Sequence, residues 1–392
     1  MSFQQGLSGL NAASKQLEVI GNNVSNANTV GFKQSRAEFS DVFANSLNGS
    51  GASQIGIGTK VSNVAQQYTQ GNITATNNSL DIAINGGGFF RMSNNGSITY
   101  SRNGQFQMDK SGYIVDASNK RLTGYTADAT GTLSSGAPAE LRIDTGDLQP
   151  SSTTEVVGLI NLDSRKTALT AAGFDPSDPT TYHNSTAVTV FDSLGNSHTL
   201  QSFFVKTAPG VWDVFTAADG VSTTVLPAPT ATMTFTGTGV APTITPASAA
   251  PVSFAVTTGA TTPVPMTLDF SQSTQFGSNF SVNSLSQDGF TSGRLAGFNT
   301  SADGTIVGRY TNGQSKTLGQ VVLANFVNPN GLQSLGGNAW ADSATSGAAL
   351  IGTPSTGSLG VLQSLAVEDS NVDLTAELVN MITAQRVYQA NA

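Results

Sequence analysis

Apolar side chains recur at alternating three- and four-residue steps at both ends of the chain. Near the start, this apolar stripe consists of Phe3, Leu7, Leu10, Leu17, Ile20 and Val24. The spacing predicts a helix over residues 1–30 with one apolar face, and Gly31 is a typical stop signal. Near the end, Asp373 is a good N-cap. The stripe that follows it consists of Leu374, Leu378, Met381, Ile382 and Tyr388.

These two predicted helices need a partner surface. An isolated helix of this length is only marginally stable in water. Burying five large apolar side chains supplies at most about 10 kcal/mol, and only if something covers them. One interpretation is packing on a globular core of the same chain. The other is pairing of the two helices with each other and with neighbouring copies.

The chain between these ends has the pattern of β-structure. Short apolar or alternating runs, typical of strands, lie at residues 82–84, 89–92, 188–191, 200–205, 252–256 and 321–326. Turn pairs that favour type I′ hairpins are Asn95-Gly96, Asn103-Gly104, Asp219-Gly220, Asp303-Gly304 and Asn312-Gly313. Residues 221–265 hold seven of the 14 prolines. We interpret them as sheet-edge strands joined by proline-bearing loops, with a flexible linker as the alternative.

Composition narrows the class of protein. Charged residues make up 11% of the chain, whereas 42 glycines and 20 phenylalanines argue for a folded, turn-rich β protein rather than disorder. The net charge is −8, and no run of basic residues suggests binding to nucleic acid or to a membrane surface. The absence of cysteine excludes disulfides and thiolate chemistry. Residues 1–30 lack the apolar core of a secretory signal peptide, so we expect export without a cleaved signal.

No residues in the sequence form a recognisable catalytic or cofactor site. His183 and His198 lie among turn residues without a carboxylate cluster at ligand spacing, so we expect surface histidines without a catalytic role. Gly86-Gly87-Gly88 lacks the ending of a phosphate-binding loop and fits a tight β connection. We therefore predict a protein that is not an enzyme and binds no cofactor or metal.

Several longer segments carry a resemblance to a known family. Residues 7–13 and 19–33 closely resemble the start of bacterial flagellar rod and hook proteins, and the second segment contains the signature Asn22, Asn23, Asn26, Gly31, Phe32 and Lys33. Further matching segments are residues 71–90, 100–106, 122–125, 323–326, 370–374 and 381–386. Residues 268–270 and 287–290 lie in a central insertion that resembles the hook members rather than the shorter rod members.

The resemblance implies a mainly β fold with terminal α-helices and nested domains. The implied parts are coiled-coil-like terminal helices that line a channel (1–30 and 371–392), a linker region (31–77 and 361–370), an inner β domain (78–148 and 285–360) and an outer β domain inserted in it (149–284). The change of composition at residues 148–152 agrees with the first boundary of the insertion. Family members continue with a helical stretch beyond the position of Ala392, where this sequence stops.

The resemblance also implies a function. The expected role is that of a structural subunit that polymerises into a flexible, extracellular helical tube, a universal joint that transmits torque from rod to filament. The implied partners are further copies of the chain, the rod, the hook cap, the hook–filament junction proteins and the type III export apparatus. Neither nucleic-acid binding nor membrane insertion is expected. A distal rod subunit is the first alternative, an extracellular β-rich adhesin the second, and an extracellular hydrolase the least favoured.

Overall fold

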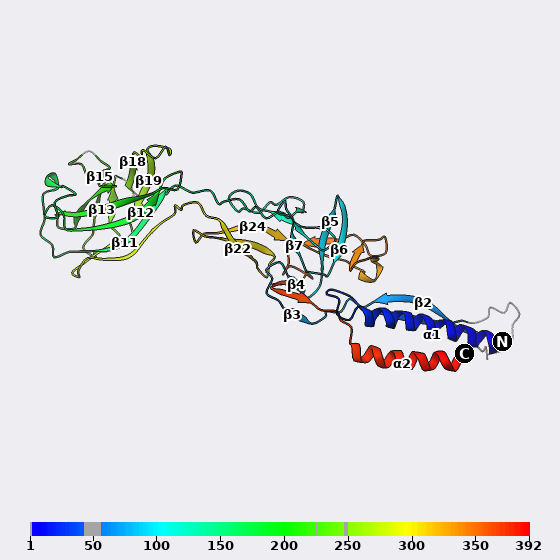
Figure 1. The fold of residues 1–392 in the computed structure, drawn as a ribbon. Coiled ribbons are helices and arrows are strands. Elements are labelled where there is room, and N and C mark those ends of the chain that lie inside the picture. The colour runs from blue at the N-terminus through cyan, green and yellow to red at the C-terminus, as the bar shows by residue number, and fades with distance from the viewer. Residues whose placement is uncertain (1, 43–55, 225, 247–249) are drawn as a thin grey trace. The chain divides into compact units, whose positions relative to one another are not determined.

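The computed structural model describes residues 2–42, 56–224, 226–246 and 250–392, and of Ser2 only the backbone. Helices lie near both ends of the chain and strands dominate the rest (Figure 1), which confirms the predicted mainly β fold with terminal α-helices. The chain forms two compact units. Unit 1 comprises Met1–Thr145, Ala296–Arg309 and Ser315–Ala392, and unit 2 comprises Gly146–Leu295 and Tyr310–Gln314. The finer division into four domains stays a prediction.

The two long helices, α1 (Ser2–Ser25) and α2 (Leu374–Asn391), lie side by side in unit 1 and run in opposite directions (Figure 1). The predicted N-cap is confirmed, because Asp373 Oδ1 accepts hydrogen bonds from the backbone N–H groups of Thr375 and Ala376. α1 ends before residue 30, where the sequence had placed its end. The Asn26 side chain donates to the Asn22 carbonyl at 2.9 Å and competes there with continued helix.

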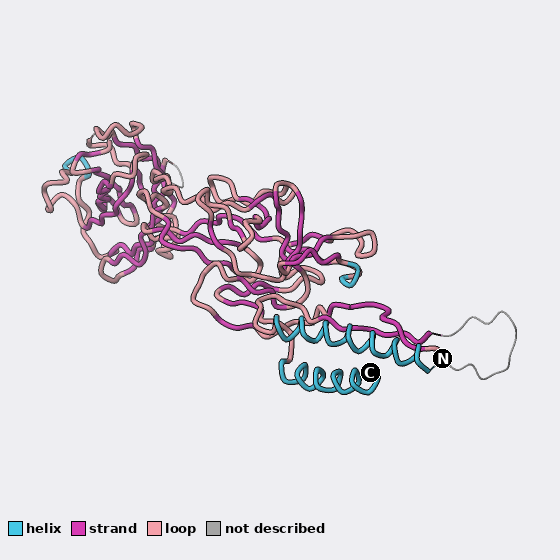
Figure 2. Tube along the Cα trace, turned by 45° about the vertical axis from the view of Figure 1, so that its right-hand side comes forward, coloured by secondary structure: helices cyan, strands magenta, loops and turns pink. Residues whose placement is uncertain are grey.

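Antiparallel strands β1 (Ser35–Val42) and β2 (Gly58–Gln66) lie along α1 (Figure 2). The remaining strands of unit 1 build one large sheet, in which the order β22-β23-β24-β9-β5-β6-β27-β26 describes the main path, and two small pairs, β29-β4 and β3-β30. These strands are β3 (Ile73–Ala75), β4 (Ile82–Asn85), β5 (Phe89–Asn94), β6 (Ser97–Ser101), β7 (Gln107–Met108), β8 (Ile114–Val115), β9 (Arg121–Thr126), β10 (Ala139–Glu140), β22 (Leu295–Thr300), β23 (Thr305–Tyr310), β24 (Ser315–Val321), β25 (Leu323–Asn325), β26 (Gln333–Gly336), β27 (Ala339–Ala341), β28 (Leu350–Gly352), β29 (Val361–Ser364) and β30 (Ala366–Glu368). A 3₁₀ turn, Pro329–Gly331, precedes β26.

An aromatic cluster forms part of the core of unit 1. Phe89, Tyr100, Phe326 and Trp340 are buried and meet edge to face, with ring centroids 4.8–6.0 Å apart. Such pairs add roughly 0.5–1.5 kcal/mol each to the free energy gained by burial. The Gly86-Gly87-Gly88 segment connects β4 to β5 tightly, as predicted, with positive φ at Gly86 and Gly88.

Unit 2 is built from two sheets with a common apolar core. One has the order β18-β19-β11-β20 with β21 beside β11, and the other β12-β13-β14-β16-β17 with β15 beside β14. Its strands are β11 (Glu155–Asp163), β12 (Asn184–Phe191), β13 (Ser197–Ala208), β14 (Val211–Ala218), β15 (Val221–Ser222), β16 (Ala231–Thr234), β17 (Thr243–Thr245), β18 (Ala250–Phe254), β19 (Val264–Asp269), β20 (Thr274–Phe276) and β21 (Ser281–Gln287), and a 3₁₀ turn spans Ala171–Gly173.

Burial on both faces explains why apolar side chains of residues 200–205 point to both sides of β13. Leu200 and Phe204 of β13 face the core between the two sheets, whereas Phe203 and Val205 face a second cluster. In that cluster Phe174 stacks on Phe215 with centroids 4.2 Å apart. Successive side chains of a strand point to opposite faces, so the consecutive apolar residues Phe203, Phe204 and Val205 fit a strand that is covered on both sides.

The proline-rich stretch is ordered wherever the structure describes it. Residues 221–265 contribute β15 to β18 and the start of β19, and β17 lies at the edge of its sheet. The interpretation as strands joined by proline-bearing loops is therefore right for the described residues, and the linker alternative is wrong.

Two of the five predicted type I′ turns are confirmed and three are wrong. Asn95-Gly96 and Asp219-Gly220 have positive φ at both positions, as this turn requires. In Asp303-Gly304 and Asn312-Gly313 only the glycine has positive φ, and in Asn103-Gly104 neither residue has. At Asp303-Gly304, Ser301 N donates to Thr305 O and Gly304 N donates to Ser301 O. These bonds close a loop of three residues, whereas a type I′ hairpin turn has a loop of two residues.

The prediction of two exposed turn histidines is wrong for His198. This residue lies within β13 and is buried, with Nδ1 2.7 Å from Asp219 Oδ2 and Nε2 3.4 Å from Asp192 Oδ2. Burial lowers its pKa, but the hydrogen bonds to the two carboxylates outweigh this effect and raise the pKa above 6.5. Burial lowers the pKa of His183, whose ring accepts a hydrogen bond from Lys206 N.

We predict opposite pH dependences for substitutions of the two histidines. A raised pKa means that the protonated His198 ring stabilises unit 2 fully below pH 6.5, and that this contribution is lost as pH rises through the folded-state pKa. His198→Gln should therefore lower the urea midpoint more at about pH 5.5 than at about pH 8. The matched His183→Gln, at a position with a lowered pKa, should do the reverse and lower the urea midpoint more at about pH 8 than at about pH 5.5.

The measurement is the fluorescence of Trp212, which is buried in the core of unit 2. Trp340→Phe removes the second of the two tryptophans in the chain. Equal losses of stability at both pH values for His198→Gln would contradict the assigned role of the protonated ring.

Candidate assembly surface and its buried anchor

The helix pair is in contact through small side chains and leaves most of the predicted apolar stripe uncovered. Ala13 of α1 and Ala384 of α2 are buried. A Cβ on Gly9 would lie only 2.7 Å from the Asn391 side chain, so the two helices approach closely here. Of the stripe residues, Ile20 is buried and Leu10, Leu17, Val24 and Met381 are half-buried. The exposed ones are Phe3, Leu7, Leu374, Leu378, Ile382 and Tyr388.

On α2, exposed apolar residues form a continuous face. Leu378 is 44% exposed and Ile382 is 52% exposed, and Val379 beside them is exposed too. These residues lie one helical turn apart on the side of α2 that faces away from α1. Large apolar surfaces that rigid elements hold open to solvent are typical of interaction sites. We call Leu378, Val379, Ile382 and Arg386 the outer face of α2.

The asparagines of the signature stabilise the junction between α1 and β1. Asn23 is buried, and its side-chain amide bonds Ser35 twice: Nδ2 donates to the Ser35 carbonyl at 2.8 Å and Oδ1 accepts from the Ser35 N–H at 2.9 Å. Asn22, Asn26 and Phe32 line a cavity of about 590 Å³ together with Trp340. The signature residues thus lie around the end of α1.

Gly31 is required by its backbone and its surroundings. Its φ is +71°, and a Cβ would lie 2.5 Å from the backbone N of Asn103. Its own N–H donates to the carbonyl of Glu368 at 2.8 Å. Any larger residue would push this segment away from the backbone of residues 102 and 103.

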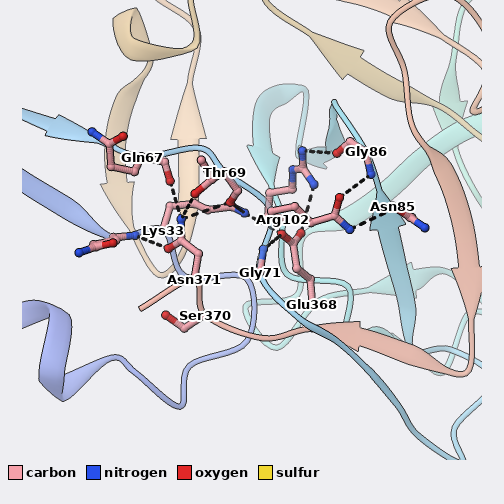
Figure 3. Close-up of polar contacts among 12 residues, drawn as sticks. Lys33, Gln67, Thr69, Gly71, Asn85, Gly86, Arg102, Glu368, Ser370 and Asn371 are labelled. Atoms are coloured by element: carbon pink, nitrogen blue, oxygen red, sulfur yellow. Dashed lines mark hydrogen bonds and ion pairs between the residues drawn. The ribbon is translucent and has the colours of Figure 1, made fainter. Parts of the chain in front are cut away.

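Lys33, the last signature residue, belongs to a buried ion cluster (Figure 3). Its Nζ lies 2.7 Å from Glu368 Oε1 and donates to the carbonyl of Thr69 at 2.7 Å. Arg102 Nη1 lies 3.1 Å from Glu368 Oε2, and Gly71 N donates to Oε1 at 2.9 Å. The side chains of Lys33 and Glu368 are fully buried and that of Arg102 nearly so. We call Lys33, Arg102 and Glu368 the anchor.

The anchor places two cations on one carboxylate. Burial lowers the pKa of Lys33, and the neighbouring Arg102 charge acts in the same direction, whereas the Glu368 carboxylate opposes both. Burial likewise lowers the pKa of Arg102 against the effect of Glu368. Arg102 Nη2 also donates to the carbonyl of Gly86 at 2.8 Å. Each of the three side chains can stay charged only while its partners are in place, because an unpaired charge in this interior would be strongly unfavourable.

Asn371 extends the anchor toward α2 (Figure 3). Its Oδ1 accepts from the Gln34 N–H at 2.7 Å, and its Nδ2 donates to the carbonyl of Gln67 at 2.8 Å and to Thr69 Oγ1 at 2.9 Å. Gln34 Nε2 then donates to Glu377 Oε1 of α2 at 2.7 Å. A chain of polar contacts thus connects the signature segment to the first turn of α2.

The sequence pointed to Lys33 but not to the other two members of the anchor, its ionic partner Glu368 and the second cation Arg102. Arg102 lies in a segment that stands out only by its resemblance to the family, and Glu368 is an acidic residue at the end of the short strand β30. Lys33 and Glu368 are separated by 335 positions. Residue spacing cannot predict a contact between positions so far apart in the sequence. The one local hint is that Glu368 is a charged residue beside apolar ones.

Across the described residues, no group of three or more His, Cys, Asp or Glu side chains is placed to hold a metal ion. In the same part of the chain, no helix is both long and apolar enough to cross a membrane. The roles predicted for the terminal stripe and for the signature residues stay predictions, since their positions alone do not test them.

Models of known protein families match most of the sequence. Residues 3–33 match "Flagella basal body rod protein", residues 83–170 match "Flagellar hook protein FlgE/F/G D1 domain", residues 161–290 match "Flagellar basal body protein FlaE D2 domain", and residues 363–392 match "Flagellar basal body rod FlgEFG protein C-terminal".

Whole-chain relatives agree with these matches. The chain is 42% identical over 403 residues to the flagellar hook protein FlgE of Salmonella typhimurium, with 100% of this chain and 96% of the relative covered. It is 41% identical to the FlgE of Escherichia coli K12, with the same coverage. The crystal structure of Helicobacter pylori flagellar hook protein FlgE2 has a similar fold, with a TM-score of 0.56 at 14% identity over 75% of this chain and 100% of that chain.

We predict that Glu368→Gln strongly destabilises unit 1. The substitution leaves the buried Lys33 and Arg102 without a counter-charge and should lower the free energy of unfolding by about 3–5 kcal/mol. Trp340, buried in unit 1, reports this in a Trp212→Phe background by urea-induced loss of fluorescence.

The matched control is Glu140→Gln. Glu140 pairs with Arg121 at a partly exposed site of the same unit, so its loss should lower the free energy of unfolding by no more than about 1 kcal/mol. Similar effects of the two substitutions would mean that the anchor is not the dominant polar contact of unit 1.

Proposed function

This chain belongs to the flagellar hook protein family, and we propose that it polymerises through its terminal helices into a flexible tube that transmits torque from rod to filament. It is a structural subunit of the bacterial flagellar hook, outside the cell, and not an enzyme. The rod-subunit, adhesin and hydrolase alternatives are set aside, because the relatives aligned over the whole chain are hook proteins.

The outer face of α2 is the observation that supports this proposal. Leu378 and Ile382 are about half-exposed although α2 already packs on α1. Each such side chain gains roughly 1.5–3 kcal/mol on complete burial. In a polymer, a neighbouring copy would cover this face of each subunit. The free energy of burial would then be gained once for every subunit added.

The composition of the β regions fits a tube that bends. Only 11% of the residues are charged, so neighbouring β surfaces would meet largely through hydroxyl, amide and glycine groups. Such contacts exchange readily with water, whereas ion pairs are directional and sensitive to salt. We propose that the helices resist twist as an inner tube while the β domains slide past one another.

The finer assignments belong to the same proposal. The domains are residues 1–30 with 371–392 for the inner tube, 31–77 with 361–370 for the linker region, 78–148 with 285–360 for the inner β domain, and 149–284 for the outer one. The partners are the rod, the hook cap and the hook–filament junction proteins. Export would occur through the type III apparatus without a cleaved signal peptide, in agreement with the missing apolar core in residues 1–30.

We predict that Leu378→Asp prevents tube formation and leaves the β sheets folded. The carboxylate would have to be buried in the contact between copies, which is strongly unfavourable. Tubes are counted by electron microscopy of the purified chain, and folding is followed by the near-ultraviolet circular dichroism of the buried aromatic clusters.

The matched control is Leu194→Asp, since Leu194 is 57% exposed in a turn of unit 2. This variant should form tubes as the unmodified chain does. Normal tubes from Leu378→Asp would refute the role of the outer face of α2.

A further inference from the structure

One carboxylate of α2 has an incomplete set of partners. Glu377 is 4% exposed, and its Oε1 accepts the hydrogen bond from Gln34. Its Oε2 is buried, and within the described part of the chain it has no hydrogen-bond partner. A buried carboxylate oxygen without a donor is unfavourable. The site therefore calls for a hydrogen-bond donor, and a cation would satisfy it best.

Glu377 borders a cavity of about 470 Å³ between α1, β1 and α2. Its wall combines polar side chains, among them Gln16 and Asn380, with the apolar Val19 and Phe39. The cavity is open to solvent, so a side chain can enter from outside. A mixed wall of this kind suits a long side chain with an apolar stem and a charged end, as in arginine.

The two helices offer few cations for this role. α1 contains one basic residue, Lys15, which pairs with Glu18 of the same helix at 2.7 Å. α2 contains one, Arg386, which is exposed and makes no ion pair within the described residues. Arg386 follows Glu377 by two and a half helical turns, about 13 Å along the axis and on the opposite side of α2. It cannot reach Glu377 of its own chain.

The surroundings of Arg386 point to a partner in another copy. Arg386 follows Val379 by two turns and Ile382 by about one, so it lies within the outer face of α2. When a neighbouring copy covers this apolar face, the guanidinium is removed from water and needs an acidic partner.

We propose that Arg386 of one copy enters the cavity of the next copy and donates to Glu377 Oε2. This inference rests on the proposed polymerisation and specifies its contact. The donor and the acceptor lie on opposite sides of one helix, so the contact is heterologous, and each copy keeps a free donor on one side and a free acceptor on the other. Heterologous contacts that do not close into a ring give open helical polymers, as a tube requires.

Arg36 of the same chain is the competing donor. It lines the same cavity but forms no ion pair with Glu377 among the described contacts. A pairing of Arg36 with Glu377 would already complete the site in a single copy. The experiment must therefore separate Arg386 from Arg36.

The first test is a double-substitution cycle on the critical concentration for polymerisation, measured by sedimentation. Arg386→Gln and Glu377→Gln should each raise it at least about tenfold, as the loss of one charge-assisted hydrogen bond implies. The double variant should be no worse than either single variant, because both changes break one interaction. Arg309→Gln, the same change at an exposed position of β23, is the control and should have no effect.

The second test measures proximity and keeps both charges. The chain contains no cysteine, so Ile382→Cys and Asn380→Cys can be introduced in separate preparations. Mixed polymers treated with a short bis-maleimide should give linked dimers, since Ile382 lies in the outer face and Asn380 borders the cavity. Mixtures of Ile382→Cys with Lys110→Cys, an exposed turn position, should not.

Three outcomes would overturn the inference. One is normal tubes without linked dimers, and another is additive effects of Arg386→Gln and Glu377→Gln. The third is coupling of Glu377→Gln with Arg36→Gln in the stability of the unpolymerised chain. Each leaves the proposed function intact, whereas an unmodified chain that forms no polymer would refute the proposed function and this inference together.

Discussion

The buried carboxylate of Glu368 is the constraint on which unit 1 depends. It accepts Lys33 from the segment after α1, Arg102 from the end of β6 and the N–H of Gly71. A buried ion cluster of this kind is rarely worth more than apolar packing of the same volume, but breaking it is severe. Its effect is to join three segments that lie far apart in the sequence, because each buried charge is satisfied only when the other segments are in place.

The anchor also explains how a chain can keep an apolar face open without collapsing onto itself. Gly31 and Asn371 flank the anchor, and each is held by hydrogen bonds to the opposite segment. The end of α1 and the start of α2 therefore lie next to fixed points, and the two helices meet through Gly9, Ala13 and Ala384. Small residues give close contact but bury little area, so the larger side chains of α2 remain available.

Local signals in the sequence predicted the elements well. The three- and four-residue steps predicted both helices, Asp373 predicted the start of α2, and the apolar or alternating run at residues 200–205 predicted the strand β13. The glycine of Asn103-Gly104 was misread as a turn signal. A Cβ there would lie 1.7 Å from the carbonyl of Ile82, so this glycine serves close approach of two backbones, which no local pattern encodes.

The contacts between segments far apart in the sequence could not be predicted, because local patterns do not encode them. Ile20 and Leu378 both belong to the predicted apolar stripes, yet Ile20 is buried within the chain and Leu378 is exposed. Periodicity states that a face is apolar but not what covers it. The isolated charges Lys33 and Glu368 likewise carry no mark of their pairing, because sequence distance is unrelated to spatial distance between segments joined by a whole fold.

Because charged residues are scarce in this chain, a single ion pair between copies, such as the proposed one of Arg386 with Glu377, would matter for assembly. Apolar burial supplies free energy but is non-directional, so helices joined by Leu378 and Ile382 alone could slide along one another. A guanidinium that has one matching carboxylate removes this freedom, because it fits in one register only. Because few other charged residues are present, few alternative registers would offer the guanidinium another acidic partner. The proposed tube, which bends in its β regions and resists twist along its helices, would need this combination of a weakly charged surface and a small number of directional contacts.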